Sequence, residues 1–170
     1  MEQDSAETGD LPLRRPATPE DALRTDGIGV LLDSAAFRDA LNKERARCDR
    51  GGAPFTLMKF ELDVPRGSAA HARCAEILAA VLKKRTRLID AKGWFSECVA
   101  VILTNTEPSQ TGKIWRAIRD AFQQHVAARD GLAAPSSVTL AHEVYSYPDA
   151  PGRSGASEIP RDPAVPGKSR

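Results

Sequence analysis

Stretches with a helical hydrophobic period alternate with short strand-like runs, and this alternation constrains the fold more than any other feature of the sequence. In the run 68–85, apolar residues from Cys74 to Leu82 recur at i, i+3 and i+4, as on one face of a helix. The run 54–62, "PFTLMKFEL", is rich in strand-forming residues. The expected elements are a helix at 34–48, a strand at 54–62, a helix at 68–85, a hairpin at 87–103, a helix at 108–130 and a strand at 136–148. This order predicts an α/β sandwich of the ferredoxin-like type, with a mixed central sheet flanked by helices.

Capping and breaking residues mark the ends of these elements. Asp33 or Ser34 is placed to cap the first helix, and Gly51 follows its end. Pro108 lies at the start of the helix after the hairpin, and Gly131 lies just past its end. The boundaries therefore agree with the hydrophobic periods.

The two ends of the chain have a different composition from its middle. Residues 1–25 are polar, contain three prolines and show no hydrophobic period. Residues 148–170 are rich in Pro, Gly, Ser and charge, so they cannot bury enough apolar surface to offset the entropy lost on ordering. We expect two disordered tails around one domain at 26–147.

Composition excludes several function classes. A formal net charge of +1 among 170 residues gives no overall field that favours nucleic acid, although a local basic cluster remains open. Residues 1–20 lack the apolar core of a signal peptide, and no run is long enough for membrane insertion. The three cysteines and three histidines lack metal-ligand spacing, so we expect reduced thiols and no metal. A cytoplasmic location is the default expectation.

Four strings then resemble the GGDEF domain, the catalytic domain of diguanylate cyclases. "DGIGVLLDSAAF" at 26–37 is similar to the family's entry motif, and "PFTLMKFELD" at 54–63 to its first strand, which ends in D-x-D. "RLID" at 87–90 stands where the family often has R-x-x-D, and "VAVILTNT" at 99–106 is similar to the strand after the signature. The resemblance implies a nucleotide-cyclase-like sandwich over about 120 residues.

The sequence departs from the family at the residues that carry chemistry. Where G-G-D/E-E-F is expected, the chain has Gly93-Trp94-Phe95-Ser96-Glu97. Glu61 holds a vestigial metal position, and the phosphate- and guanine-contacting motifs that follow the first strand in the family are missing. Because phosphoryl transfer needs bound Mg²⁺ and a positioned nucleotide, we expect no enzyme activity and no cofactor.

Two functions remain open from the resemblance. The first is a catalytically inactive regulatory or protein-interaction module in bacterial signalling, with an unidentified protein partner and a loose similarity to segments found beside exopolysaccharide sugar transferases. In that case Trp94 and Phe95 form an interaction surface, or Trp94 fills the vacated pocket. The second is a receptor that binds cyclic di-GMP through Arg87 and Asp90, because an arginine fork suits guanine and phosphate. A surface arginine followed by a turn-forming aspartate explains the same string equally well.

Overall fold

The computed structural model describes residues 31–128 and 138–148. Its elements are α2 (Ser34–Asp49), β1 (Phe55–Leu62), α3 (Ala69–Arg85), β2 (Ala91–Phe95), β3 (Cys98–Thr104), α4 (Pro108–Ala127) and β4 (Leu140–Tyr147). The predicted order of helices and strands is confirmed over these elements. The expected tails at 1–25 and 148–170, apart from Pro148, lie outside the described residues, as do the first residues of the expected domain.

The four strands form one sheet in the order β2-β3-β1-β4. The crossover through α3 leaves a gap between β1 and β2, and β3 fills this gap. Every neighbouring pair of strands is therefore antiparallel. The flanking helices and the ferredoxin-like order are confirmed. The sheet was expected to mix parallel and antiparallel strand pairs, but all three pairs of strands in it are antiparallel. Within the described ranges, the parallel pairing is confined to an isolated bridge between Leu32 and Gly93.

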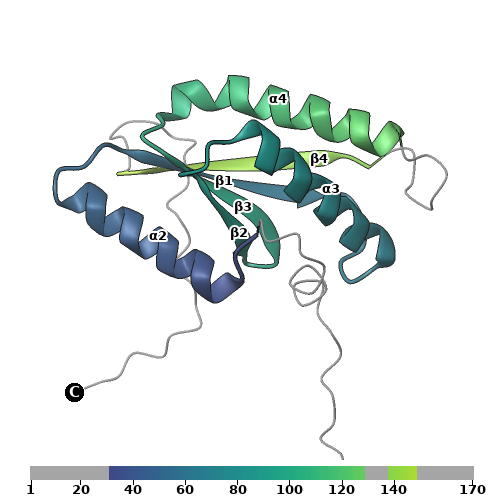
Figure 1. Ribbon diagram of the computed structural model, residues 1–170, viewed down its shortest axis with the longest axis horizontal. Helices are drawn as coiled ribbons and strands as arrows, with labels where there is room; N and C mark the ends of the chain where they lie inside the picture. The colour runs from purple at the N-terminus through teal and green to yellow at the C-terminus, as the bar shows by residue number, and fades with distance from the viewer. Residues whose placement is uncertain (1–30, 129–137, 149–170) are drawn as a thin grey trace, which may run out of the picture.

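The helices lie on both faces of the sheet, as Figure 1 shows. Because side chains alternate along a strand, β1 contributes to two apolar cores. Met58 and Phe60 pack in the larger core with α3 and α4, whereas Phe55 and Leu57 pack in the smaller core with α2. This alternation explains the continuous apolar run in the sequence of β1.

Both ends of α2 and the start of α4 at Pro108 follow the capping chemistry expected from the sequence, whereas Gly131 lies outside the described residues. Asp33, rather than Ser34, caps α2, and its Oδ1 accepts a hydrogen bond from the amide of Ala36 at 2.8 Å. Gly51 follows α2 with a φ of 88°, a left-handed conformation that glycine adopts without strain. No helix in the described residues combines the length and apolarity that a membrane crossing requires.

Candidate functional site

A cleft of about 120 Å³ opens at the turn of the β2–β3 hairpin, beside the end of β1. Its walls come from Phe60–Leu62 of β1, from Arg66 and His71 around the start of α3, and from Trp94 and 97–99 of the hairpin. In this fold the cleft brings together the end of the first strand, the start of the next helix and the hairpin turn. We therefore take this cleft as the candidate ligand site.

An ion pair spans the mouth of the cleft. Arg66 Nη1 lies 2.7 Å from Glu97 Oε2, and both side chains are largely exposed. Ser96 and Glu97 form the hairpin turn with φ values of 48° and 63°, the left-handed pair that a two-residue type I′ turn requires. The turn thus directs the Glu97 carboxylate to a cation of the chain itself.

Glu61, the vestigial metal position, is also paired with a cation. Its Oε1 lies 2.9 Å from Lys59 Nζ, and Lys59 Nζ lies 3.0 Å from Glu143 Oε2 on β4. Burial opposes the charge of Lys59, but the hydrogen bonds to Glu61 and Glu143 outweigh it and raise the pKa of Lys59. Tyr145 Oη donates to Glu143 Oε2 at 2.6 Å. This hydrogen bond and the one from Lys59 both lower the pKa of Glu143. These charges form a closed cluster on the sheet.

The remaining polar groups of the cleft are uncharged. His71 is buried, and its Nδ1 has no hydrogen-bond partner among the described residues. Burial, helped by the nearby charge of Arg66, lowers the pKa of His71 and favours the neutral ring. Burial also raises the pKa of the Cys98 thiol, which Arg66 Nη2 approaches at 3.8 Å. A protonated thiol is a poor nucleophile, so this cysteine is not poised for covalent chemistry.

The groups at the cleft do not fit the Mg²⁺ that the resemblance to cyclases implies. Magnesium requires free carboxylate oxygens in octahedral geometry. Here both Glu61 and Glu97 are neutralised by cations of the chain, Lys59 and Arg66. Over the described ranges, no three His, Cys, Asp or Glu side chains come together as a metal site. Each of the two carboxylates at the cleft is therefore already held by a cation of the chain.

Gly93 occupies the place where the family signature has two glycines, and it faces the protein interior. A Cβ atom at this position would lie 2.6 Å from the carbonyl oxygen of Leu32 and 2.8 Å from Cδ2 of Phe37. Leu32 also exchanges two backbone hydrogen bonds with β2, one from its amide to Lys92 O and one from Trp94 N to its own carbonyl. The space over this glycine is thus occupied by the chain that enters α2.

The proposed interaction surface at Trp94 and Phe95 is wrong, because both side chains are only 5% exposed. Trp94 packs in the core beneath α3 and α4, and Phe95 packs in the core beneath α2, with its ring 6.0 Å from that of Phe37. Successive residues of β2 point to opposite faces, and both faces are covered at this strand. Of the two roles left open for Trp94, the structure favours filling space over contacting a partner.

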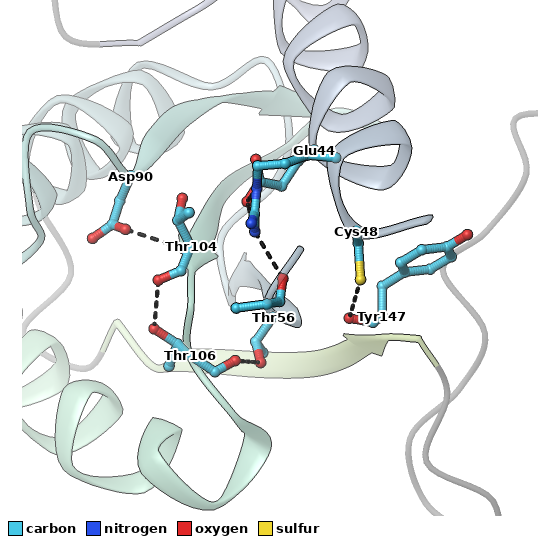
Figure 2. Close-up of polar contacts among 9 residues, drawn as sticks. Glu44, Cys48, Thr56, Asp90, Thr104, Thr106 and Tyr147 are labelled. Carbon is cyan, nitrogen blue, oxygen red and sulfur yellow. Dashed lines mark hydrogen bonds and ion pairs between the residues drawn. The ribbon is translucent and has the colours of Figure 1, made fainter. Parts of the chain in front are cut away.

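Arg87 and Asp90 have different environments. Arg87 is exposed, whereas Asp90 is buried at 4% exposure. Asp90 Oδ2 accepts from the amide of Arg87 at 2.8 Å, and Oδ1 accepts from the amide of Thr104 at 3.2 Å. Figure 2 shows that this second contact continues from Thr104 to Thr106 and then to Thr56 of β1. The Asp90 carboxylate therefore fastens a turn to the sheet through two backbone amides, while the Arg87 side chain is exposed.

Sequence reasoning missed Arg66, His71 and Cys98 as neighbours in one cleft. Arg66 lies 31 positions before Glu97, and no spacing rule joins residues so far apart. The available signal was local. Arg66 and His71 flank Ser68, the residue that caps α3, in the short segment that follows the end of β1. That signal becomes specific only when the hairpin turn is placed opposite it.

The strand order and the two helical layers define an α/β domain with the ferredoxin-like arrangement. No protein-family model matches the sequence. No curated protein matches it either.

Solved structures do match, among them GGDEF domains and diguanylate cyclases. The GGDEF domain of DgcB from Caulobacter crescentus, in complex with c-di-GMP, is 21% identical with a TM-score of 0.57, covering 84% of each chain. A DGC protein from Thermotoga maritima is 15% identical with a TM-score of 0.58, covering 73% of this chain and 87% of that chain. The diguanylate cyclase SiaD from Pseudomonas aeruginosa, in complex with its activator SiaC, is 23% identical with a TM-score of 0.59, covering 75% of this chain and 51% of that chain.

These similarities establish the fold of this chain. It has the fold of the GGDEF domains of diguanylate cyclases, and the predicted fold class is confirmed. The match spans about half of the SiaD chain. At these identities the likeness does not carry the neighbours' activities over to this protein, because one fold can host different functions.

Proposed function

We propose that this domain is a GGDEF-fold module without cyclase activity, and that it works in bacterial signalling by regulatory contact with another protein. The observation that carries the proposal is the filled space over Gly93. A nucleotide can approach a backbone closely only where no side chain stands, and here Leu32 O and Phe37 stand within 3 Å of the missing Cβ position.

The charges at the cleft support the same proposal. Phosphoryl transfer depends on positioning and on neutralising phosphate charge through metal ions. Glu61 and Glu97, the carboxylates at this cleft, are neutralised by Lys59 and Arg66. The ion pairing of both carboxylates and the contact over Gly93 are the two observations that support a domain without cyclase activity.

A protein partner is the ligand class that we propose. SiaD was solved in complex with its activator SiaC, so a chain that contains this fold can be bound by a regulatory protein. A bacterial source, a cytoplasmic location and a link to exopolysaccharide synthesis belong to the same proposal. The location rests on the sequence composition, and the other two rest on the sequence resemblance.

The direct test is incubation of the full chain with GTP and Mg²⁺, followed by chromatographic detection of cyclic di-GMP. An active diguanylate cyclase run in parallel serves as the positive control. We expect no product. Cyclic di-GMP that forms with the parent and disappears in Glu97→Gln would overturn the proposal, because Glu97 is the carboxylate of the signature hairpin that faces the cleft.

Binding of cyclic di-GMP through Arg87 is the second candidate, favoured by the exposure of this arginine in a turn. The buried state of Asp90 weighs against it, because the carboxylate already accepts two backbone amides. Calorimetric titration of the parent, of Arg87→Ala and of Arg85→Ala separates the cases, since Arg85 is an exposed arginine two positions away. Heat that is lost only in Arg87→Ala would support a receptor, and the absence of heat with the parent would exclude one.

A further inference from the structure

The turn between α3 and β2 presents two large apolar side chains to solvent. Leu88 is 100% exposed and Ile89 is 64% exposed. In the described part of the chain, Leu32 at 37% is the next most exposed large hydrophobic residue. Single exposed apolar residues are common, but two adjacent and largely exposed ones in one turn form an unusual convex tip.

Basic residues precede the two apolar side chains in the sequence. Lys83, Lys84 and Arg85 end α3, and Arg87 begins the turn, and all four are exposed. No carboxylate forms an ion pair with any of them over residues 31–128 and 138–148. The one acidic residue of the segment, Asp90, is buried. The tip therefore combines four positive charges with two apolar side chains in seven successive residues, 83–89.

The turn is held in this shape by polar contacts below it. The Asp90 carboxylate accepts from the amides of Arg87 and Thr104. Lys92 is buried, and its Nζ donates to the carbonyls of Arg87 at 3.0 Å and of Asp90 at 2.7 Å. The backbone on both sides of Leu88 and Ile89 is thus fastened to the sheet, and the two side chains are held away from the protein.

We propose that this tip, residues 83–89, docks on the surface of a bilayer that contains anionic lipid, with Leu88 and Ile89 entering the boundary between headgroups and acyl chains. Basic residues near such a surface each add affinity, and apolar side chains add more by leaving water. A convex tip of two apolar residues is far below the area of a stable protein–protein interface, which needs roughly 1,200 Å² or more. A bilayer adapts to a convex shape, so the tip fits lipid better than it fits a preformed protein pocket.

Co-sedimentation of the full chain with vesicles tests this proposal. Vesicles of phosphatidylglycerol mixed with phosphatidylcholine should sediment the protein, and vesicles of phosphatidylcholine alone should not. Binding should weaken as salt is raised, because exposed charges are screened over about 10 Å at 0.1 M ionic strength. Failure to sediment with the anionic vesicles at low salt would overturn the proposal.

Two variants locate the site. Leu88→Ser with Ile89→Ser should weaken binding by at least about tenfold, because burial of such a side chain is worth more than one factor of ten. Lys83→Gln with Lys84→Gln should weaken it by about fivefold for each charge removed. Both variants should fold, since the four side chains are exposed.

Lys113→Gln with Arg116→Gln is the matched control, because it removes two exposed charges from α4 while leaving the tip intact. Equal losses in the control and the tip variants would show a non-specific charge effect and overturn the proposal.

A fluorescent probe gives an independent reading of insertion. Leu88→Trp places an indole at the fully exposed position. The parent chain, which contains Trp94 and Trp115, gives the background emission on the same vesicles. On anionic vesicles the emission of the added tryptophan should move to shorter wavelength as it leaves water. Sedimentation without this shift would place the contact elsewhere on the chain and overturn the assignment to the tip.

Discussion

Phe37 and Gly93 lie so close together that a Cβ atom added to Gly93 would stand 2.8 Å from Cδ2 of Phe37. The carbonyl oxygen of Leu32 would be nearer still, at 2.6 Å, and as a backbone atom it cannot turn aside. Glycine at this position therefore lets the chain entering α2 cross β2 in direct contact. In this domain the residue has a packing role that is independent of any nucleotide.

Replacement of Gly93 by alanine should destabilise the domain. Overpacking of a filled core typically costs about 1–3 kcal/mol, and here the strand must shift to relieve the contact. Urea unfolding followed by circular dichroism measures the effect. Gly112→Ala is the control, because Gly112 lies inside α4 with no atom within 4 Å of the added Cβ. That change should stabilise the domain by about 1 kcal/mol through helix propensity. A Gly93→Ala protein as stable as the parent would contradict the packing role.

Replacement of Asp90 by asparagine should also destabilise the domain. The buried carboxylate accepts from two backbone amides, whereas an asparagine oxygen can serve only one and its NH₂ group would face the other. A buried donor without a partner costs about 1–3 kcal/mol, so we expect a loss of that size in the free energy of unfolding. Asp120→Asn, at an exposed aspartate that pairs only with its neighbour Arg119, should leave the stability nearly unchanged. Equal behaviour of the two variants would contradict the role of Asp90 as a brace.

The stability of the domain should fall as the solution is acidified below about pH 6.5. Burial lowers the pKa of both His71 and His142 from the ordinary value of 6.5, with Arg66 adding to the effect at His71. The unfolded chain then binds more protons than the native one below that pH, so the native state loses stability as pH falls toward the lowered pKa values. Urea midpoints measured from about pH 7.5 to about pH 5.5 should show the slope.

His71→Gln and His142→Gln should each reduce this dependence on pH, because each removes one group that titrates differently in the two states. A slope that is the same in the parent and in both variants would contradict the assignment.

Tyr145 should ionise at unusually high pH. Burial, together with its hydrogen bond to Glu143, raises the pKa of Tyr145 to about 12. Absorbance titration in a Tyr147→Phe background isolates this group, because the chain has two tyrosines. Glu143→Gln should lower the pKa only part of the way, since burial remains. The neutral phenol stabilises the native state below pH 10, and this contribution is lost as pH rises through the folded pKa. Ionisation near the ordinary value of 10.0 would show that this environment does not persist in solution.

Local sequence signals determined the elements of this protein. The spacing from Cys74 to Leu82 predicted α3, the capping residues predicted the helix ends, and the strand-forming runs predicted β1 and the hairpin. These signals succeed because helix and strand periods reflect interactions between residues close in sequence. The motif resemblance added the fold type, which the solved structures confirm.

Only the tertiary structure decided which residues meet and which are covered. Trp94 and Phe95 were expected at a surface, but helices on both faces of the sheet bury them. The sequence left open whether Asp90 faces a ligand or shapes a turn, and the structure folds it inward onto the amide of Thr104. Arg66 meets Glu97 because a crossover helix and a hairpin bring separate strand ends together. Burial and pairing depend on contacts distant in the sequence, and a one-dimensional pattern does not contain them.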